Sequence, residues 1–484
     1  MSERDEELTG KLPHPEEDFS TWYTQVIRRA QLADYTPVRG SMAIRPYGYA
    51  LWENMQALLD RRIKATGHVN AYFPLLVPES LLQKEAEHVA GFAPQVAWVT
   101  EAGTEKLEER YAIRPTSEAI IGALYSKWID SWRDLPVLIN QWANVIRWEK
   151  VTRPFLRTAE FLWQEGHTVH RTEEEAEEET LRMLGVYQDF IENELAIPVI
   201  PGRKTESEKF AGALRTYSVE ALMRDGRALQ AGTSHNLGQH FARVFDITFQ
   251  DQDGERKYVW QTSWGVSTRL IGALIMAHGD ASGLIFPPNV APIQIVIVPI
   301  WRKDEDRQPV LEATDQVLAR LRPPYRIEAD TDDTKTPGWK YNEHEMRGVP
   351  LRMEIGPRDV QNRSVVLVRR LDRRKETVPI AQLAARVPAL LREVQQEIFD
   401  RALRCRAENT HPVETWDEFR RVMEEQRGFI IALWCGDAAC ETAIQHETTA
   451  TIRCLPLDRP CEVTGPCIRC GGEAKEQAVF AKAY

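Results

Sequence analysis

The segment Val145–His170, VIRWEKVTRPFLRTAEFLWQEGHTVH, constrains the fold more than any other part of the chain. Arg147 and Glu149 stand two residues apart on an expected β-strand, so their side chains point to one face. Arg157 and Glu160 follow after a short loop. Because burying an unpaired charge is costly, packing alone does not explain such a strand. The pattern predicts either a site for a ligand with phosphate and amine groups or a surface hairpin with a cross-strand ion pair, and residue types alone leave both open.

Composition excludes several classes of protein. At 484 residues the chain is too long for one ordinary core, so two to four domains are expected. The longest apolar runs, such as Ile293–Ile300, are too short for a membrane span, and the acidic N-terminus does not resemble a signal peptide. Seven cysteines in a chain of this length do not suggest a secreted disulfide framework. We therefore expect a cytoplasmic protein, and the net charge of −11 argues against sequence-independent coating of nucleic acid.

The order of expected helices and strands divides the chain into three domains. Residues 1–288 mix helices and strands without βαβ regularity, which favours an α+β domain on an antiparallel sheet. Within it, Thr172 is expected to cap a helix that runs to about Leu195. The proline-rich segment Phe286–Asn289 is typical of a linker. Residues 289–405 alternate strands and helices as a small α/β domain does, and residues 406–484 form a cysteine-bearing C-terminal domain.

Two closely spaced cysteine pairs predict a metal site in the C-terminal domain. The pairs are Cys435 with Cys440 and Cys467 with Cys470. A tetrahedral zinc site is built from two such turns, each of which supplies two thiolates. With all four positions filled by protein, the site is expected to be structural. Cys454 and Cys461 lie between the pairs and could substitute for a member, and reduced core cysteines without a metal are the alternative.

Three further segments carry polar residues in unusual order. Residues 114–118, RPTSE, set a hydroxyl and a carboxylate after a proline, and residues 230–235, QAGTSH, form a small-residue loop rich in donors and acceptors. Residues 263–269, SWGVSTR, place a glycine turn before an arginine at the mouth of an apolar helix. Taken singly, these segments are better explained as a helix-capping threonine, a tight turn and a surface arginine than as parts of a binding site.

Taken together and in this order, the segments resemble the prolyl-tRNA synthetases of the archaeal/eukaryotic-like type, a family of class II aminoacyl-tRNA synthetases. Motif 1 corresponds to the region around Arg45–Gly48, motif 2 to Val145–His170 and motif 3 to Thr262–Met276. The resemblance covers about Phe19 to Tyr484. It implies an antiparallel-sheet catalytic domain, an α/β anticodon-binding domain and a small C-terminal α/β zinc-binding domain.

The resemblance implies that the chain activates L-proline with ATP and Mg²⁺ and transfers it to the 3′ end of tRNA(Pro). Arg147 would bind the α-phosphate and the proline carboxylate, Arg157 an outer phosphate and Arg269 the γ-phosphate, which makes Arg147 and Arg269 the catalytic residues. Catalysis would consist of positioning and neutralisation of phosphate charge. The further ATP-binding residues implied are Glu149 for the adenine amine, Phe161 for ring stacking, and Thr158, Gln230, Thr233 and Ser267. Gln230 is expected to contact Mg²⁺ or ATP.

The resemblance also implies the remaining specificity sites. The proline pocket would consist of Thr116, Glu118, Arg147 and His235, with Glu118 pairing with the secondary amine. The residues suited to reading unstacked anticodon bases are Lys340, Arg347, Arg352 and Glu354. The interval from His170 to Thr262 is too short for an editing domain, so misactivated alanine is expected to escape hydrolysis in cis.

One position departs from the family, and two other functions compete. Ala159 stands in LRTAEF where relatives often carry a larger, commonly charged residue, which puts one contact with tRNA in doubt. Motif 1 implies a homodimer. A non-catalytic tRNA-binding paralogue would lack the phosphate arginines, and a threonine enzyme would carry its zinc in the active site; neither expectation fits this sequence.

Overall fold

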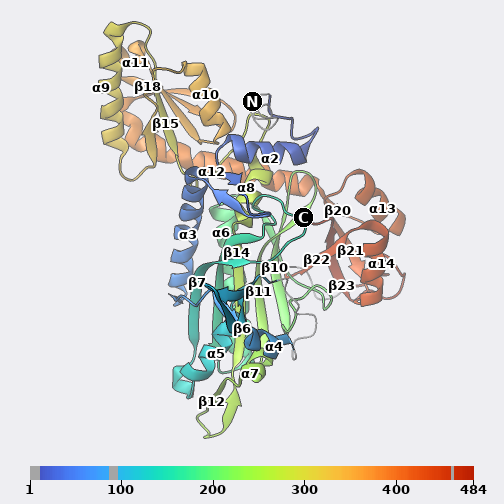
Figure 1. The fold of residues 1–484 in the computed structure, drawn as a ribbon. Helices are drawn as coiled ribbons and strands as arrows, with labels where there is room; N and C mark the ends of the chain where they lie inside the picture. The colour runs from blue at the N-terminus through green and yellow to red at the C-terminus, as the bar shows by residue number, and fades with distance from the viewer. Residues whose placement is uncertain (1–10, 87–95, 459–462) are drawn as a thin grey trace.

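The computed structural model describes residues 11–86, 96–458 and 463–484, which form three parts (Figure 1). A central core carries a large mainly antiparallel sheet, a five-stranded α/β part lies at one end, and a C-terminal part lies at one side. This arrangement confirms the predicted antiparallel-sheet core followed by two α/β units. The boundaries at 288/289 and 405/406 stay predictions.

The central sheet of the core supplies the surface on which most of the expected site residues lie. Its strands in spatial order are β9 (Val199–Arg203), β10 (Arg215–Leu222), β11 (Ala228–Gly238), β14 (Trp260–Ser267), β8 (Glu160–His170), β7 (Val137–Ile146) and β3 (Val69–Asn70). All neighbours are antiparallel except β3, which runs parallel to β7. Helix α6 (Glu173–Asn193) packs on β10, β11 and β14, and its N-cap is Thr172, as predicted.

Smaller elements surround this sheet. They are α2 (Phe19–Arg29), β1 (Ala33–Tyr35), β2 (Met42–Ile44), α3 (Pro46–Ala65), β4 (Leu76–Pro78), α4 (Glu79–Ala86), β5 (Trp98–Ala102), β6 (Glu105–Ile113), α5 (Glu118–Trp128), α7 (His240–Phe245), β12 (Thr248–Gln250), β13 (Arg256–Tyr258) and α8 (Arg269–His278). A short 3₁₀ turn, η1, spans Trp132–Asp134. Helix α8 is buried along its length from Leu270 onward and begins at an arginine, as the expected apolar helix after residues 263–269 requires.

The five-stranded part follows the proline-rich linker. Its strands, in the order β16 (Ile327–Ala329), β15 (Ile295–Pro299), β17 (Leu351–Ile355), β18 (Ser364–Arg369) and β19 (Lys375–Pro379), are covered by α9 (Asp304–Leu321), α10 (Pro337–Met346), α11 (Pro357–Asn362) and α12 (Leu383–Glu408), with a 3₁₀ turn η2 at Ile380–Gln382. A partly buried bidentate ion pair ties it to the core, because Arg370 donates to both oxygens of Asp280 at 2.9 and 2.6 Å. From here α12 extends toward the C-terminal part (Figure 1).

The C-terminal part extends the central sheet instead of forming a sheet of its own. Its elements are β20 (Thr410–Pro412), α13 (Trp416–Glu425), β21 (Phe429–Trp434), α14 (Ala438–Thr448), β22 (Thr451–Pro456) and β23 (Glu476–Ala481). Strand β22 pairs with β9 through Leu455↔Arg203 and Pro456↔Gly202, so eleven strands run continuously from β20 to β3. This continuity has no counterpart in the local sequence pattern.

The end of strand β7 differs from its predicted position. The prediction that Arg147 and Glu149 lie on a strand is wrong: β7 ends at Ile146, and the chain then opens into a loop, although the Arg147 amide still donates to the Ala159 carbonyl at 2.8 Å.

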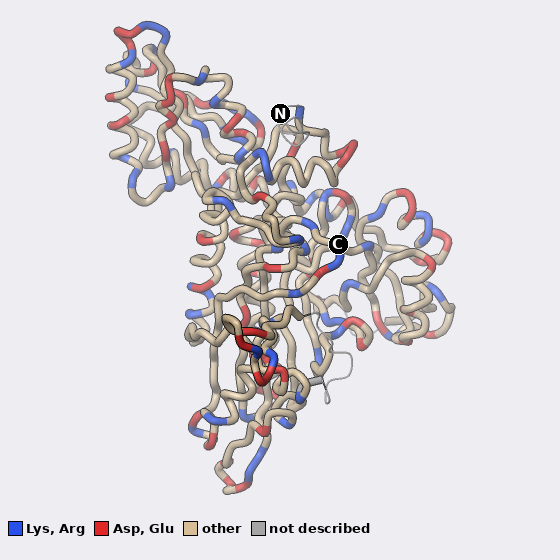
Figure 2. The backbone as a smooth tube through the Cα atoms, in the orientation of Figure 1, with Lys and Arg blue, Asp and Glu red and all other residues tan. Residues whose placement is uncertain are grey.

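Among the described helices, none combines the length and the apolar character that a bilayer crossing requires. Figure 2 shows Lys and Arg interspersed with Asp and Glu in all three parts.

The close approach of α3 to the preceding chain gives a test of core packing. A Cβ added at Gly48 would lie 2.2 Å from the Leu32 carbonyl oxygen, whereas one added at Gly185 in α6 would meet nothing within 4 Å. We expect Gly48→Ala to lower the free energy of unfolding by about 1–3 kcal/mol through overpacking. Gly185→Ala is the control and should raise it by up to about 1 kcal/mol. Thermal unfolding of both variants measures this, and a Gly48→Ala protein as stable as the wild type would contradict the contact.

Candidate active site

A cavity of about 310 Å³ opens on one face of the central sheet, over β8, β11 and β14. Most of the residues expected at the site line this cavity: Thr116, Glu118, Arg147, Phe161, Gln230, Thr233, His235, Ser267 and Arg269. Three expected residues do not. Thr158 borders a neighbouring cavity of about 250 Å³, Arg157 borders a third of about 160 Å³ that shares Arg269, and Glu149 lies on the loop after β7.

Strand register explains why these side chains meet. In β8 the alternate residues Trp163, Glu165 and His167 face the same side of the sheet, and they lie opposite Ser267, Gly265 and Ser263 of β14. Strand β11 continues the pattern, since Thr233 and His235 lie opposite Gly265 and Ser263. The cavity floor is therefore built from every second residue of three adjacent strands.

One end of the cavity carries carboxylates that are held by hydrogen bonds. Thr116 Oγ1 donates to Glu118 Oε2, and Ser117 Oγ donates to Glu165 Oε1 at 2.5 Å. His167 Nε2 lies 2.9 Å from the second oxygen of Glu165. Burial disfavours the charged forms of both Glu165 and His167, but their contact outweighs it, so the pKa of Glu165 is lowered and that of His167 is raised.

Glu165 and His167 were not predicted as site residues. The signal that would have found them is the alternation of Phe161, Trp163, Glu165 and His167 along one strand, which places all four on the face of the predicted site.

His235 forms a neutral wall beside these carboxylates. Its Nδ1 lies 2.9 Å from Thr216 Oγ1, and its ring centroid lies 4.9 Å from that of Phe210. Burial, with a smaller contribution from the charge of His167, lowers the pKa of His235 to about 3. The imidazole is therefore uncharged at neutral pH and presents an apolar face.

The other end of the cavity carries guanidinium groups without acid partners. Within the described part of the chain, neither Arg147 nor Arg269 forms an ion pair with a carboxylate. Arg147 Nε donates to the Pro115 carbonyl at 3.0 Å, and its guanidinium lies 5.3 Å from the Trp163 ring. Arg269 donates to the Leu156 carbonyl at 3.3 Å and to the Gln230 carbonyl at 3.5 Å.

The surroundings of these two arginines lower their pKa values. Desolvation by the cavity walls lowers the pKa of Arg147, which is nevertheless open to solvent through the cavity mouth. Burial and then the charges of Arg147 and Arg157 lower the pKa of Arg269 to about 10. Both arginines remain protonated at neutral pH, so this end of the cavity is suited to a polyanion.

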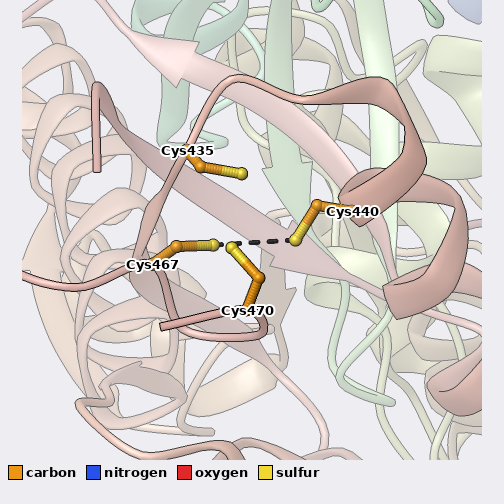
Figure 3. Close-up of side chains that lie close together, drawn as sticks. All are labelled: Cys435, Cys440, Cys467 and Cys470. Atoms are coloured by element: carbon orange, nitrogen blue, oxygen red, sulfur yellow. Dashed lines mark hydrogen bonds between the residues drawn. The ribbon is translucent and has the colours of Figure 1, made fainter. Parts of the chain in front are cut away.

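The four cysteines predicted as metal ligands come together in the C-terminal part (Figure 3). Their sulfurs all lie within 4.8 Å of one another, and the Sγ atoms of Cys440 and Cys467 are 3.6 Å apart. Burial opposes ionisation of Cys467, but backbone amides of Cys470 and Arg469 help lower its pKa to about 7. Four convergent thiols, one of them readily ionised, fit a tetrahedral metal site. Cys454 lies apart, buried in β22, and Cys461 lies outside the described residues.

Comparisons with known proteins agree along the whole chain. Residues 98–278 match the tRNA synthetase class II core domain (G, H, P, S and T), residues 294–390 an anticodon binding domain and residues 416–484 the C-terminal domain of prolyl-tRNA synthetase. The proline–tRNA ligase of Natranaerobius thermophilus is 59% identical over 486 residues and covers 100% of both chains. That of Roseiflexus sp. is 58% identical over 473 residues, covering 97% of this chain and 98% of the relative.

The chain belongs to the prolyl-tRNA synthetase family. A solved relative, prolyl-tRNA synthetase from Cryptosporidium parvum complexed with halofuginone and AMPPNP, superimposes with a TM-score of 0.94 at 41% identity and covers 99% of each chain. The resemblance drawn from the motifs is thus confirmed.

In this member of the prolyl-tRNA synthetase family, the four expected anticodon residues already have partners inside the protein. Lys340 is buried and donates to the Asp330 carbonyl at 2.7 Å, and Arg347 donates to Gln31 Oε1 in the core at 3.1 Å. Arg352 pairs with Glu354 at 3.1 Å. Their assignment to the anticodon stays a prediction.

The Glu165–His167 pair predicts a pH-dependent stability. Because the pKa of His167 is raised above 6.5, its contribution to stability is complete below that pH and is lost as pH rises through the raised pKa. Because the pKa of Glu165 is lowered below 4.5, its contribution is lost only as pH falls through that lower value. We expect the difference in melting temperature between wild type and His167→Gln to be largest between these limits and to shrink in alkaline buffer. A difference that grows with pH would refute the pairing.

Proposed function

We propose that this chain is a proline–tRNA ligase, which uses ATP to convert L-proline into prolyl-adenylate and then transfers the prolyl group to the 3′ end of tRNA(Pro). The observation that carries this proposal is the division of one cavity between a carboxylate end at Glu118 and an arginine end that carries Arg147 and Arg269. The amine of an amino acid is positively charged and the phosphates of a nucleoside triphosphate are negatively charged. A cavity with a carboxylate end and an arginine end can hold both molecules with their reacting atoms together. The full-length similarity to proline–tRNA ligases supports it.

The proposed first step is attack of the proline carboxylate on the α-phosphate, with release of pyrophosphate. The carboxylate is already ionised, so the step requires alignment and neutralisation of charge and no strong base. Arg147 would contact both the attacking carboxylate and the α-phosphate, while Arg157 and Arg269 would hold the outer phosphates. Each such charge-assisted contact contributes about 1.5–3 kcal/mol.

The carboxylate end would select proline. Glu118, oriented by Thr116, would pair with the charged secondary amine, and neutral His235 would pack against the pyrrolidine ring. For ATP, Glu149 would accept from the adenine amine, Phe161 would stack on the ring, and Thr158, Thr233 and Ser267 would complete the site. Mg²⁺ bound with ATP would neutralise phosphate charge, and the Gln230 amide in the cavity wall is suited to contact it.

Three further assignments belong to the same proposal. The domains at 1–288, 289–405 and 406–484 would act as catalytic, anticodon-binding and zinc-binding units in a cytoplasmic enzyme. We propose a homodimer formed around motif 1, because Val69, Tyr72 and Leu76, which follow α3, are 61%, 71% and 41% exposed. Zn²⁺ is the metal proposed for the four-cysteine cluster.

Proline-dependent ATP–pyrophosphate exchange, measured with each of the twenty amino acids, tests the proposed function. We expect proline to support exchange and threonine to fail, and tRNA(Pro) to be charged with proline. Absence of proline-dependent exchange in a folded, metal-replete protein would contradict the proposal and favour the non-catalytic paralogue.

Substitution of Arg269 tests the role of the arginine end. Arg269→Ala should abolish exchange, with a loss of at least about 10²-fold, because the outer phosphate loses its buried cation. Arg302→Ala, an exposed arginine outside the core, is the matched control and should keep wild-type activity. The far-ultraviolet circular dichroism of both variants should match that of the wild type, and an active Arg269→Ala enzyme would rule out the assigned role.

Metal content tests the cysteine cluster. Protein purified without added zinc should contain one zinc ion per chain, and Cys470→Ser should lower that content and the melting temperature, because the site loses one of four thiolates. Cys405→Ser changes a cysteine outside the cluster and should leave both unchanged. Equal zinc content in Cys470→Ser and wild type would exclude this ligand set.

The expected lack of editing in cis gives a final test. The described segment between β8 and β14 is taken up by α6, β9, β10, β11, α7, β12 and β13 of the core. Alanine is smaller than proline, and a missing methylene costs only about 1–3 kcal/mol, so slow alanine-dependent exchange is expected. The purified enzyme should not hydrolyse alanyl-tRNA(Pro), and hydrolysis without a second protein would overturn this expectation.

A further inference from the structure

A fully buried ion cluster lies where the C-terminal part joins the catalytic sheet. Glu220 of β10 is completely buried and accepts hydrogen bonds from Lys204 Nζ at 2.8 Å and from Ser218 Oγ at 2.7 Å. Its second oxygen accepts from Nε and Nη2 of Arg453 in β22, at 3.1 and 3.0 Å. Lys204 also donates to the Arg453 carbonyl at 2.5 Å. Both carboxylate oxygens are thus occupied, one of them by a residue of the C-terminal part.

This cluster lies one strand away from the proposed phosphate site. Glu220 pairs in register with Gln230 of β11, whose carbonyl accepts from Arg269 Nη1 at 3.5 Å. Arg269 interacts electrostatically with both Glu220 and Arg453. Among the described residues, Arg269 has no carboxylate within ion-pair distance; Glu220, whose charge influences it, is already paired with Lys204 and Arg453.

The arrangement sets up a competition for Arg269. A half-buried guanidinium and a fully buried carboxylate attract each other more strongly than two charges at the surface, since less solvent screens them. If the Glu220 oxygen bound by Arg453 lost that partner, the attraction between Glu220 and Arg269 would no longer be offset by the charge of Arg453. The Arg269 guanidinium would then turn away from the cavity and from an incoming polyphosphate.

We infer that Arg453 is a positioning residue for the ATP site: together with Lys204 it occupies both oxygens of Glu220 and leaves Arg269 available to phosphate. The inference rests on the proposed role of Arg269 and adds to it a dependence on the C-terminal part. A purely structural role, in which the cluster only joins β22 to the core, is the alternative, because buried ion pairs are weak indicators of function.

Arg453→Met removes the charge but keeps a side chain of similar length. In proline-dependent ATP–pyrophosphate exchange, we expect the KM for ATP to rise on the order of tenfold and the KM for proline to stay within about twofold. Arg203→Met is the matched control, since Arg203 forms an exposed ion pair with Glu476 between the same two parts, at 2.9 Å. It should leave both KM values unchanged.

The double variant Arg453→Met/Glu220→Gln separates positioning from structure. Removing the carboxylate removes the competitor for Arg269, so the double variant should recover a KM for ATP within about twofold of the wild type. If the cluster only joined the two parts, the double variant would be at least as impaired as the single one. A wild-type KM for ATP in folded Arg453→Met, or an unrescued KM in the double variant, would overturn the inference.

Substitute variants and a measurement on the unsubstituted enzyme complete the test. If Arg453→Met does not fold, the double variant and Glu220→Gln replace it: both should keep a KM for ATP close to that of the wild type, and a raised value in either would contradict the inference. Failure of the proposed function itself is distinguishable, because it would abolish proline-dependent exchange in the unsubstituted enzyme.

Discussion

The antiparallel pairing of β8, β14 and β11 is the constraint on which the site depends. Side chains alternate between the two faces of a strand, so a slip of one residue would turn Glu165, His167 and His235 away from the cavity. The pairing is fixed by packing on the opposite face, where Trp264 lies against Gly166. A Cβ at Gly166 would lie 2.1 Å from the Trp264 indole, so the glycine in WQEGH permits this packing.

A separation of charge follows from that register. The carboxylates of Glu118 and Glu165 are held by hydroxyl and imidazole groups. Arg147, in contrast, contacts a backbone carbonyl and the Trp163 ring, and Arg269 contacts two backbone carbonyls. A site with carboxylates at one end and cations without acid partners at the other does not neutralise itself. Its charges remain available to a substrate amine and to phosphates, and this is the physical basis of the proposed mechanism.

The sequence predicted local features and family motifs well but could not reveal pairings between distant segments. The Thr172 cap with its helix and the cysteine cluster follow from residue spacing, and most cavity residues follow from the resemblance of the motifs to a known family. The pairing of β22 with β9 joins residues about 250 positions apart, and no local periodicity encodes it. For the same reason the contact of Arg453 with Glu220 was not foreseen. The end of β7 before Arg147 was missed because strand ends depend on partners, here the loop that carries Arg157.

If the arginine end of the cavity binds phosphate, the affinity of the protein for a nucleotide depends on how many phosphates the nucleotide carries. The dissociation constants of nucleotides measure this dependence directly. Equilibrium binding of AMP, ADP and ATP should be measured at one ionic strength with Mg²⁺ present. We predict that affinity rises with each added phosphate and that ATP binds at least about tenfold more tightly than AMP, since only the outer phosphates of ATP would reach Arg269 and Arg157 in the proposed binding mode. AMP binding as tightly as ATP would contradict it.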